Sequence, residues 1–260
     1  MKTGNMKKRM MMVMAVALAA GVVNAADVSA TADFASAYIF RGVTLNDGLV
    51  FQPSAKISGF PIPKEYGSVA VGTWANYDIA DYDGAKKKNE FSEIDYYATY
   101  TLPVKVVDLS ATYTEYTYPN SASTADREVA LSVGKAIGKT GLYPSLTVNY
   151  GLDGLVQENW YIQGGLDYTK SLTEALTFSS GVKVAYLVNH AGKDGFNDAT
   201  AKIGLSYALT KNWAINTSFN YVAQLDDEVL VDTPAGEPST SGTFGYDMPV
   251  YGMLGLSCNF

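Results

Sequence analysis

Histidine, the side chain that enzymes use most often as an acid or base, is scarce in this chain of 260 residues. The sole histidine, His190, stands in the stretch 187–192. A hydrolase needs a nucleophile and a base that a third group orients. No Ser-His-Asn arrangement like that of a barrel phospholipase is set out around His190 on a lipid-facing strand. We therefore interpret His190 as a solvated loop residue and predict that the protein is not an enzyme.

Carboxylates offer a second kind of chemistry. Glu93 and Asp95 are two residues apart, so they share one face of a strand, where they could act as acid and base or line a lumen. The acidic runs 78–83 and 226–228 contain the oxygen ligands that calcium prefers, but neither has the spacing of a known calcium loop. The chain also lacks a phosphate-binding glycine loop and any heme or zinc motif. No cofactor and no metal site are predicted.

The elements that must position these residues begin after a secretory signal. Four basic residues precede the apolar run 10–23, and small residues follow as far as Ala25. This run of 14 residues is shorter than the roughly 20 that a spanning helix needs. We expect cleavage after Ala25, which divides the chain into a signal peptide, 1–25, and one domain, 26–260.

Charge and cysteine content exclude two further classes. The signal holds four basic and no acidic residues, so its removal changes the formal net charge from −7 to −11. Nucleic-acid binding depends on neutralising phosphates with lysine and arginine, so such a partner is not expected. Cys258 is the only cysteine, which excludes an intramolecular disulfide and any cysteine-based zinc site.

The remaining sequence alternates with a period of two. In the segment 91–102, Ile94 and Ala98 fall on one face, whereas Glu93 and Thr99 fall on the other, as in a strand with one apolar and one polar side. Twelve such strands are predicted, at roughly 28–40, 49–59, 67–77, 91–102, 107–118, 127–137, 142–152, 159–169, 175–187, 198–209, 213–222 and 248–260.

The connectors between these strands alternate in length. Short turns are predicted at 103–106, 138–141, 170–174 and 210–212. Longer polar loops are predicted at 78–90, 188–197 and 223–247, whereas 60–66 is a long exception among the turns. Short turns at one end and long loops at the other are typical of outer-membrane barrels. The sequence therefore predicts an all-β fold, a transmembrane antiparallel up-and-down β-barrel of twelve strands.

The composition of the two strand faces indicates how such a barrel is oriented. One face is rich in Ser, Thr, Gly, Asn, Asp and Lys, which suit a wet lumen, and the other carries Leu, Ile, Val, Ala and Tyr, which suit lipid. A soluble sandwich would bury its apolar face instead. Aromatic residues near strand ends suggest interfacial girdles, namely Trp74, Tyr77, Tyr150, Trp160, Tyr168, Trp213 and Tyr221. The expected location is the cell outer membrane, with its lipids as partners.

The C-terminal segment carries a candidate assembly signal. Leu254, Leu256, Cys258 and Phe260 fall on one face of the last predicted strand. A final strand that ends in phenylalanine resembles the signal that the barrel-assembly machinery reads in outer-membrane proteins. We therefore expect that machinery to be a partner, with Phe260 as the signal.

The stretch 35–44 reads Ala-Ser-Ala-Tyr-Ile-Phe-Arg-Gly-Val-Thr. It resembles the opening motif of the TorF family, in which a Ser-Asp-Tyr-like strand runs into Arg-Gly-Val-Ser. The signal, the length and the terminal aromatic residue agree with that family over the whole chain. The resemblance implies a small outer-membrane barrel of the porin kind and no particular solute. Arg41 and Gly42 are either a pore-lining cation with a turn glycine or the end of a strand.

The expected function is a channel for passive diffusion of small hydrophilic solutes or ions, with a weak preference for cations. Strand parity predicts seven acidic and four basic pore-lining residues: Asp33, Glu93, Asp95, Asp108, Glu128, Asp167 and Asp198 against Arg41, Lys56, Lys183 and Lys202. The alternative is a non-transporting structural or adhesin-like barrel that acts through its extracellular loops. The loop 223–247 is relevant to both functions. It either projects outward, as an adhesin-like barrel would require, or folds inward as a constriction of the channel.

Removal of Phe260 should lower the yield of folded barrel without changing export to the periplasm, because the assembly signal would be lost. Heat-modifiable migration on a gel measures the folded fraction, and periplasmic extracts measure export. A truncated protein that folds in normal yield would contradict the assigned role of Phe260.

Overall fold

The computed structural model describes residues 26–82, 87–233 and 244–260. The predicted signal peptide, 1–25, lies outside these ranges and stays a prediction. No helix in the described part of the chain is long and apolar enough to span a membrane. The only helical elements described are two short 3-10 turns, η2 (Lys64–Tyr66) and η3 (Gly154–Val156).

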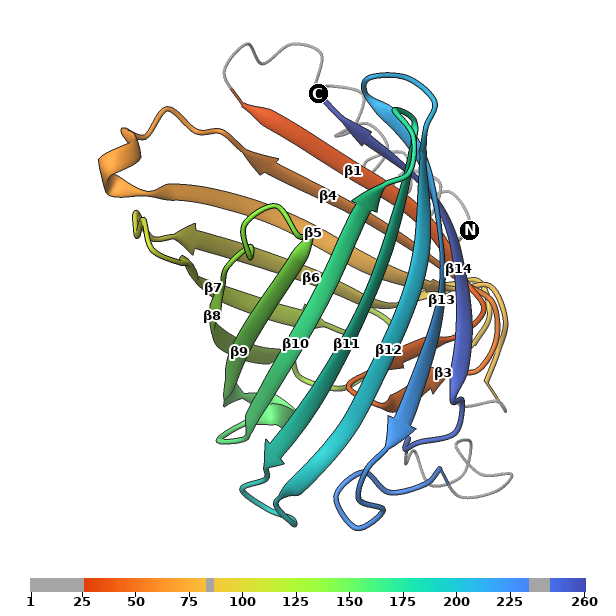
Figure 1. Ribbon diagram of the computed structural model, residues 1–260. Coiled ribbons are helices and arrows are strands. Elements are labelled where there is room, and N and C mark those ends of the chain that lie inside the picture. Colours follow the sequence, from red (N-terminus) through yellow and green to blue (C-terminus); the bar gives the residue numbers. More distant parts are fainter. Residues whose placement is uncertain (1–25, 83–86, 234–243) are drawn as a thin grey trace.

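Twelve antiparallel strands form one closed barrel (Figure 1). The barrel strands are β1 (Asp27–Ala35), β4 (Val50–Ser58), β5 (Ser68–Asp78), β6 (Glu90–Thr101), β7 (Asp108–Thr117), β8 (Asp126–Gly134), β9 (Leu142–Asp153), β10 (Trp160–Ser171), β11 (Leu176–Val188), β12 (Gly195–Ala208), β13 (Trp213–Gln224) and β14 (Val250–Asn259). Each strand pairs with its neighbours in this order, and β1 pairs with β14 to close the ring. The predicted fold is therefore confirmed.

The seam between β1 and β14 is paired along its full length. Seven residue pairs run from Ser29 with Asn259 to Ala35 with Met253. Val28 and Phe260 extend the ladder by two mutual backbone hydrogen bonds, of 3.0 and 2.9 Å. The start of β1 and the C-terminal residue therefore lie at the same end of the barrel, which is the end of the short turns.

The first predicted strand, 28–40, is wrong at its C-terminal end, whereas the other predicted bounds agree within three residues. β1 ends at Ala35, and the next residues form a separate hairpin of β2 (Tyr38–Phe40) and β3 (Val43–Asn46). Arg41 and Gly42 connect them with φ angles of 52° and 83°. Two successive residues with positive φ make the tight turn that a two-residue hairpin favours. Alternation alone cannot distinguish such a hairpin from a longer wall strand.

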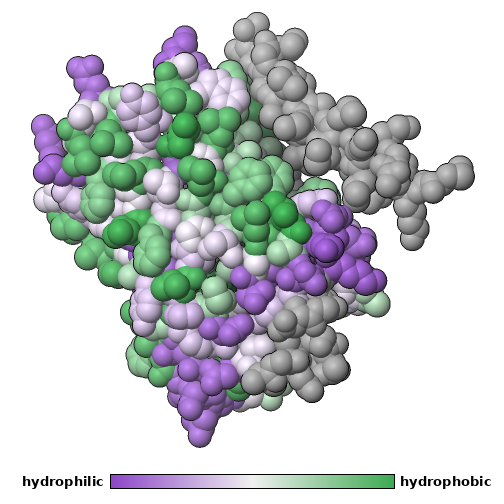
Figure 2. Space-filling view, turned by 90° about the vertical axis from the view of Figure 1, so that its right-hand side faces the viewer, coloured by the Kyte–Doolittle hydropathy of each residue, from purple (hydrophilic) through white to green (hydrophobic). Residues whose placement is uncertain are grey.

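The exterior of the barrel is apolar. On β12, Ile203 and Leu205 are 55% and 42% exposed, whereas Gly204 between them is buried. Figure 2 shows many apolar side chains across the wall and hydrophilic ones toward its two ends, including the bottom of the view, where the long loops lie. This arrangement reverses that of a soluble protein and matches a lipid-facing wall.

Aromatic rings pair along this exterior near both strand ends. Tyr150 packs against Trp160 with ring centroids 4.5 Å apart, and Trp213 packs against Phe260 at 6.2 Å. Trp74 was predicted to belong to such a girdle, and this is wrong. Its ring faces the interior and packs against Tyr38 at 5.3 Å, because the hairpin supplies an aromatic partner there.

The topology predicts which connectors face the medium. In a Cys258→Ser background, a cysteine at Ala191 in the loop 189–194 should react with a membrane-impermeant thiol reagent on intact cells. A cysteine at Glu174 in the turn 172–175 should react only after the cells are opened. Long loops of outer-membrane barrels face outward, which gives the direction. Labelling of Glu174→Cys alone on intact cells would invert the orientation.

Candidate functional site

The hairpin after β1 crosses the interior of the barrel. We call residues 36–48 the lumen hairpin. Its contacts reach strands on several sides of the ring: the Tyr38 hydroxyl donates to Glu93 on β6 at 2.8 Å, and Asn46 Nδ2 donates to Asp78 on β5 at 2.8 Å. On another side, Asn197 Nδ2 on β12 donates to the backbone oxygen of the turn at 2.8 Å. One segment that bonds to strands so far apart in the ring must lie across the lumen (Figure 1).

Arg41, at the tip of the lumen hairpin, is held by charge and by aromatic rings. Its two terminal nitrogens donate to the two carboxylate oxygens of Glu128 on β8, each at 2.7 Å. The guanidinium carbon lies 4.8 Å from the ring centroid of Phe40 and 4.4 Å from that of Tyr161. Burial opposes the charged form, but the hydrogen bonds and the charge of Glu128 outweigh it and raise the pKa of Arg41.

This ion pair is largely sheltered from solvent, since the side chains of Arg41 and Glu128 are 18% and 4% exposed. A bidentate contact between guanidinium and carboxylate is geometrically specific as well as strong. Loss of one partner would leave the other charge buried without compensation, which is costly. The pair therefore fixes the tip of the hairpin against the opposite wall.

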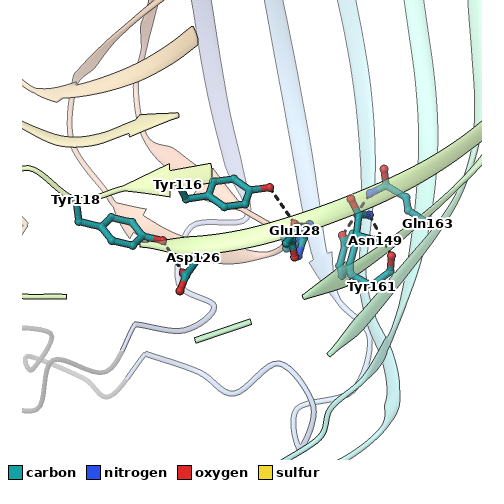
Figure 3. A network of polar contacts seen from close by, with 8 residues as sticks. Tyr116, Tyr118, Asp126, Glu128, Asn149, Tyr161 and Gln163 are labelled. Carbon is teal, nitrogen blue, oxygen red and sulfur yellow. Dashed lines mark hydrogen bonds and ion pairs between the residues drawn. The ribbon is translucent and has the colours of Figure 1, made fainter. Parts of the chain in front are cut away.

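Tyrosine hydroxyls hold the carboxylates around the hairpin. Figure 3 shows Tyr116 aimed at Glu128 and Tyr118 aimed at Asp126, with hydrogen bonds of 2.9 and 2.7 Å. Further round the wall, Tyr161 donates to Asp198 at 2.8 Å. Because a tyrosine donor is neutral, it orients a carboxylate without cancelling its charge.

The last long loop contacts the lumen hairpin from its other side. The amide of Thr44 donates to the backbone oxygen of Gly245 at 2.7 Å, and the amide of Met248 donates to the Thr44 hydroxyl at 3.0 Å. Any Cβ at Gly42 would lie 2.4 Å from a methyl group of Leu230, so the turn and the loop fit closely. The described arms of the predicted loop 223–247 thus fold inward, and residues 234–243 lie outside the described part of the chain.

The eleven predicted pore-lining residues fall into two groups. Five gather at the lumen hairpin: Arg41, Glu93, Asp95, Glu128 and Asp198. The other six stand along the strands: Asp33, Lys56, Asp108, Asp167, Lys183 and Lys202. Among these, Asp108 accepts from Tyr143 at 3.0 Å and Asp33 accepts from Thr31 at 2.8 Å. That these residues line an open pore stays a prediction.

Sequence reasoning missed most of the uncharged residues at this site. Tyr38, Asn46, Tyr161 and Asn197 are buried and make side-chain hydrogen bonds to the hairpin or its surroundings. It also omitted the buried Asp126. Their position in the sequence could have identified the residues of the barrel wall, Asp126, Tyr161 and Asn197. These residues stand on inward faces near the long-loop ends of their strands.

The histidine and the acidic runs singled out in the sequence do not come together in one site. His190 Nδ1 lies 3.0 Å from Glu158 Oε2, and both side chains are exposed. In the run 226–228, Asp226 and Glu228 face Lys193. Within the described residues no group of three or more His, Cys, Asp or Glu side chains is arranged to hold a metal ion. Asp83, from the other acidic run, lies outside those residues.

A closed twelve-stranded barrel with an apolar exterior and a polar interior crossed by a hairpin has the architecture of a small outer-membrane porin. The chain belongs to a family described as "Bacterial protein of unknown function (Gcw_chp)", whose sequence pattern matches residues 19–240. A search of curated proteins gave no match. The TorF resemblance of residues 35–44 rests on the sequence alone.

Among the solved structures of similar fold are two porins and an outer-membrane channel. The KdgM porin in complex with disordered oligogalacturonate has a TM-score of 0.52 and 11% identity, over 90% of this chain and 99% of that one. The NanC porin has a TM-score of 0.52 and 11% identity, over 89% and 98%. An outer-membrane channel from Pseudomonas putida F1 has a TM-score of 0.53 and 8% identity, over 92% and 96%. At these identities the likeness is one of fold.

Replacement of Arg41 by alanine should release the lumen hairpin. Amide hydrogen exchange over residues 36–48 should rise roughly ten- to a hundredfold, because hydrogen bonds to charged groups are worth about 1.5–3 kcal/mol. The matched control is Arg127→Ala, which breaks exposed ion pairs with Glu115 and Asp153 and should leave this exchange unchanged. Equal protection in wild type and Arg41→Ala would show that the ion pair does not hold the hairpin.

Proposed function

We propose that this protein is a channel for passive diffusion of small hydrophilic solutes or ions across the outer membrane. The observation that carries the proposal is the lumen hairpin, which narrows a closed barrel with a polar interior to a constriction lined by charged and hydroxyl side chains. Eight-stranded barrels fill with side chains and sixteen-stranded ones leave an aqueous channel, so twelve strands with an inserted hairpin suit small solutes.

We further propose a weak preference for cations. Asp126 and Asp198 receive hydrogen bonds from neutral tyrosines, and within the described residues neither makes an ion pair. At the constriction the charge of Arg41 is cancelled by Glu128. Low-dielectric walls that carry net negative charge concentrate cations. The predicted pore lining, with seven acidic and four basic residues, also carries a net negative charge.

The same charge argues against a polyanionic solute. The KdgM porin was solved with oligogalacturonate, a chain of carboxylates. In this chain the lysines predicted to face the lumen, Lys56, Lys183 and Lys202, stand on the strands β4, β11 and β12, whereas the constriction is acidic. We therefore propose cationic or neutral solutes in place of an acidic oligosaccharide.

The second candidate function is a structural or adhesin-like barrel that acts through its loops. Its support is the size of the connector 225–249, the longest at the loop end. Both described arms of this connector bond to the interior, through Gln224 with Leu230 and through Thr44 with Gly245. These inward contacts favour a constriction. We also propose that the assembly machinery recognises Phe260, whose side chain is 49% exposed at the end of β14.

Planar-bilayer recording of the purified protein tests this function. Discrete open steps are expected, with a reversal potential under a salt gradient that indicates cation preference. The preference should fade with salt, because the screening length falls from about 10 Å at 0.1 M to about 3 Å at 1 M. Silence would favour the structural alternative.

The double variant Lys183→Glu/Lys202→Glu should strengthen the cation preference at low salt, since both positions are predicted to face the lumen on adjacent strands. The matched control is Lys135→Glu/Lys139→Glu in the turn 135–141, where the same charge change lies on exposed residues. An anion-selective wild type, or an unchanged reversal potential in the lumen variant, would contradict the assignment of the inward faces.

A further inference from the structure

A cavity lies between the lumen hairpin and the barrel wall, with a free volume of about 270 Å³. The hairpin residues 37–40 form one side of it. The wall side comes from four strands, β4, β5, β6 and β14, through Gln52, Trp74, Asp95, Tyr251 and Met253. Such a volume suits a molecule of a few heavy atoms, below the range of drug-sized ligand pockets.

Asp95 places an unpaired hydrogen-bond acceptor at this cavity. The residue is 8% exposed, and its Oδ1 is buried without a hydrogen-bond partner in the described chain. A buried polar atom without a partner costs free energy, more so when the group carries charge. A donor that enters the cavity and reaches Oδ1 would remove that cost.

The negative charge at this point is shared with Glu93. Glu93 stands two residues before Asp95 on the same inward face of β6, and it accepts from the Tyr38 hydroxyl at 2.8 Å. Two neighbouring carboxyl groups can share a proton and still carry one negative charge between them. No Lys or Arg lines the cavity, and the nearby Arg41 is bound to Glu128. The site therefore attracts a positive charge.

Apart from Gln52, the rest of the lining is aromatic or apolar. Trp74 and Tyr38 pack with ring centroids 5.3 Å apart, and Phe40, Tyr251 and Met253 complete the walls. Aromatic faces stabilise ammonium groups, and tryptophan does so best. A hydrated inorganic ion gains little from such walls, whereas an alkyl group gains by burial.

We propose that this cavity binds a small organic ammonium ion, whose N–H group donates to Asp95 Oδ1 while its alkyl part packs against Trp74 and Met253. The inference deepens the proposed channel function and rests on it, since it gives the channel a solute class, small alkylamines. An alcohol of the same size lacks the charge, and a carboxylate of the same size is repelled by Glu93 and Asp95.

Calorimetric titration of the folded protein in detergent with n-butylammonium chloride tests the proposal. Saturable binding is expected, with n-butanol and sodium butyrate binding at least about tenfold more weakly, as loss of a charged hydrogen bond predicts. Asp95→Asn should weaken n-butylammonium binding by a similar factor, because it removes the carboxylate charge and nearly keeps the shape of the side chain. The matched control, Asp167→Asn on β10, removes an acid that does not line the cavity and should bind normally.

A second variant, Trp74→Leu, leaves Asp95 in place and should also weaken binding, because it removes the aromatic face. Absence of saturable n-butylammonium binding to the wild type would overturn the proposal, as would equal binding of n-butanol or unchanged affinity in Asp95→Asn. Bilayer recording of the same preparation separates this result from the channel function. Conductance without amine binding would remove the solute assignment alone, and amine binding in a silent protein would remove the channel alone.

Discussion

The architecture depends on the requirement that no backbone N–H or C=O group meets lipid without a partner. Pairing of β1 with β14 meets this requirement, because it converts a twelve-stranded sheet with two open edges into a ring with none. Closure also fixes which residues face inward, since side chains alternate across each strand. The exposed Ile203 and Leu205 and the buried Gly204 between them are one consequence of that ring.

Within the ring, the lumen hairpin determines which polar and aromatic side chains meet in the interior of the barrel. Its turn depends on the positive φ angles of Arg41 and Gly42, and its position depends on hydrogen bonds to strands around the wall. The aromatic residues that surround it serve two purposes: tyrosine hydroxyls orient carboxylates, and ring faces contact the guanidinium of Arg41. Neutral tyrosine hydroxyls, and not only the cation of Arg41, therefore hold the acidic side chains of the interior in place.

The sequence was sufficient for the barrel and insufficient for its interior. Alternation and connector length predict twelve strands, because one face of every strand meets lipid and the opposite face meets the polar interior. The same alternation led to two wrong predictions: a first strand that continues through Tyr38, and an exterior position for Trp74. A period of two does not reveal where the chain leaves the barrel wall and enters the interior. Contacts such as that of Tyr38 with Glu93 join residues 55 positions apart, and no local pattern specifies them.

The contact between Thr44 and Met248 spans 204 positions of the chain. Closing a long loop costs conformational entropy. The seam between β1 and β14 already joins the two ends of the chain, so it brings the last long loop close to the lumen hairpin and offsets most of that cost for the Thr44–Met248 contact. The hold of this loop on the hairpin therefore depends on the closed ring, because an open sheet would leave the two segments far apart.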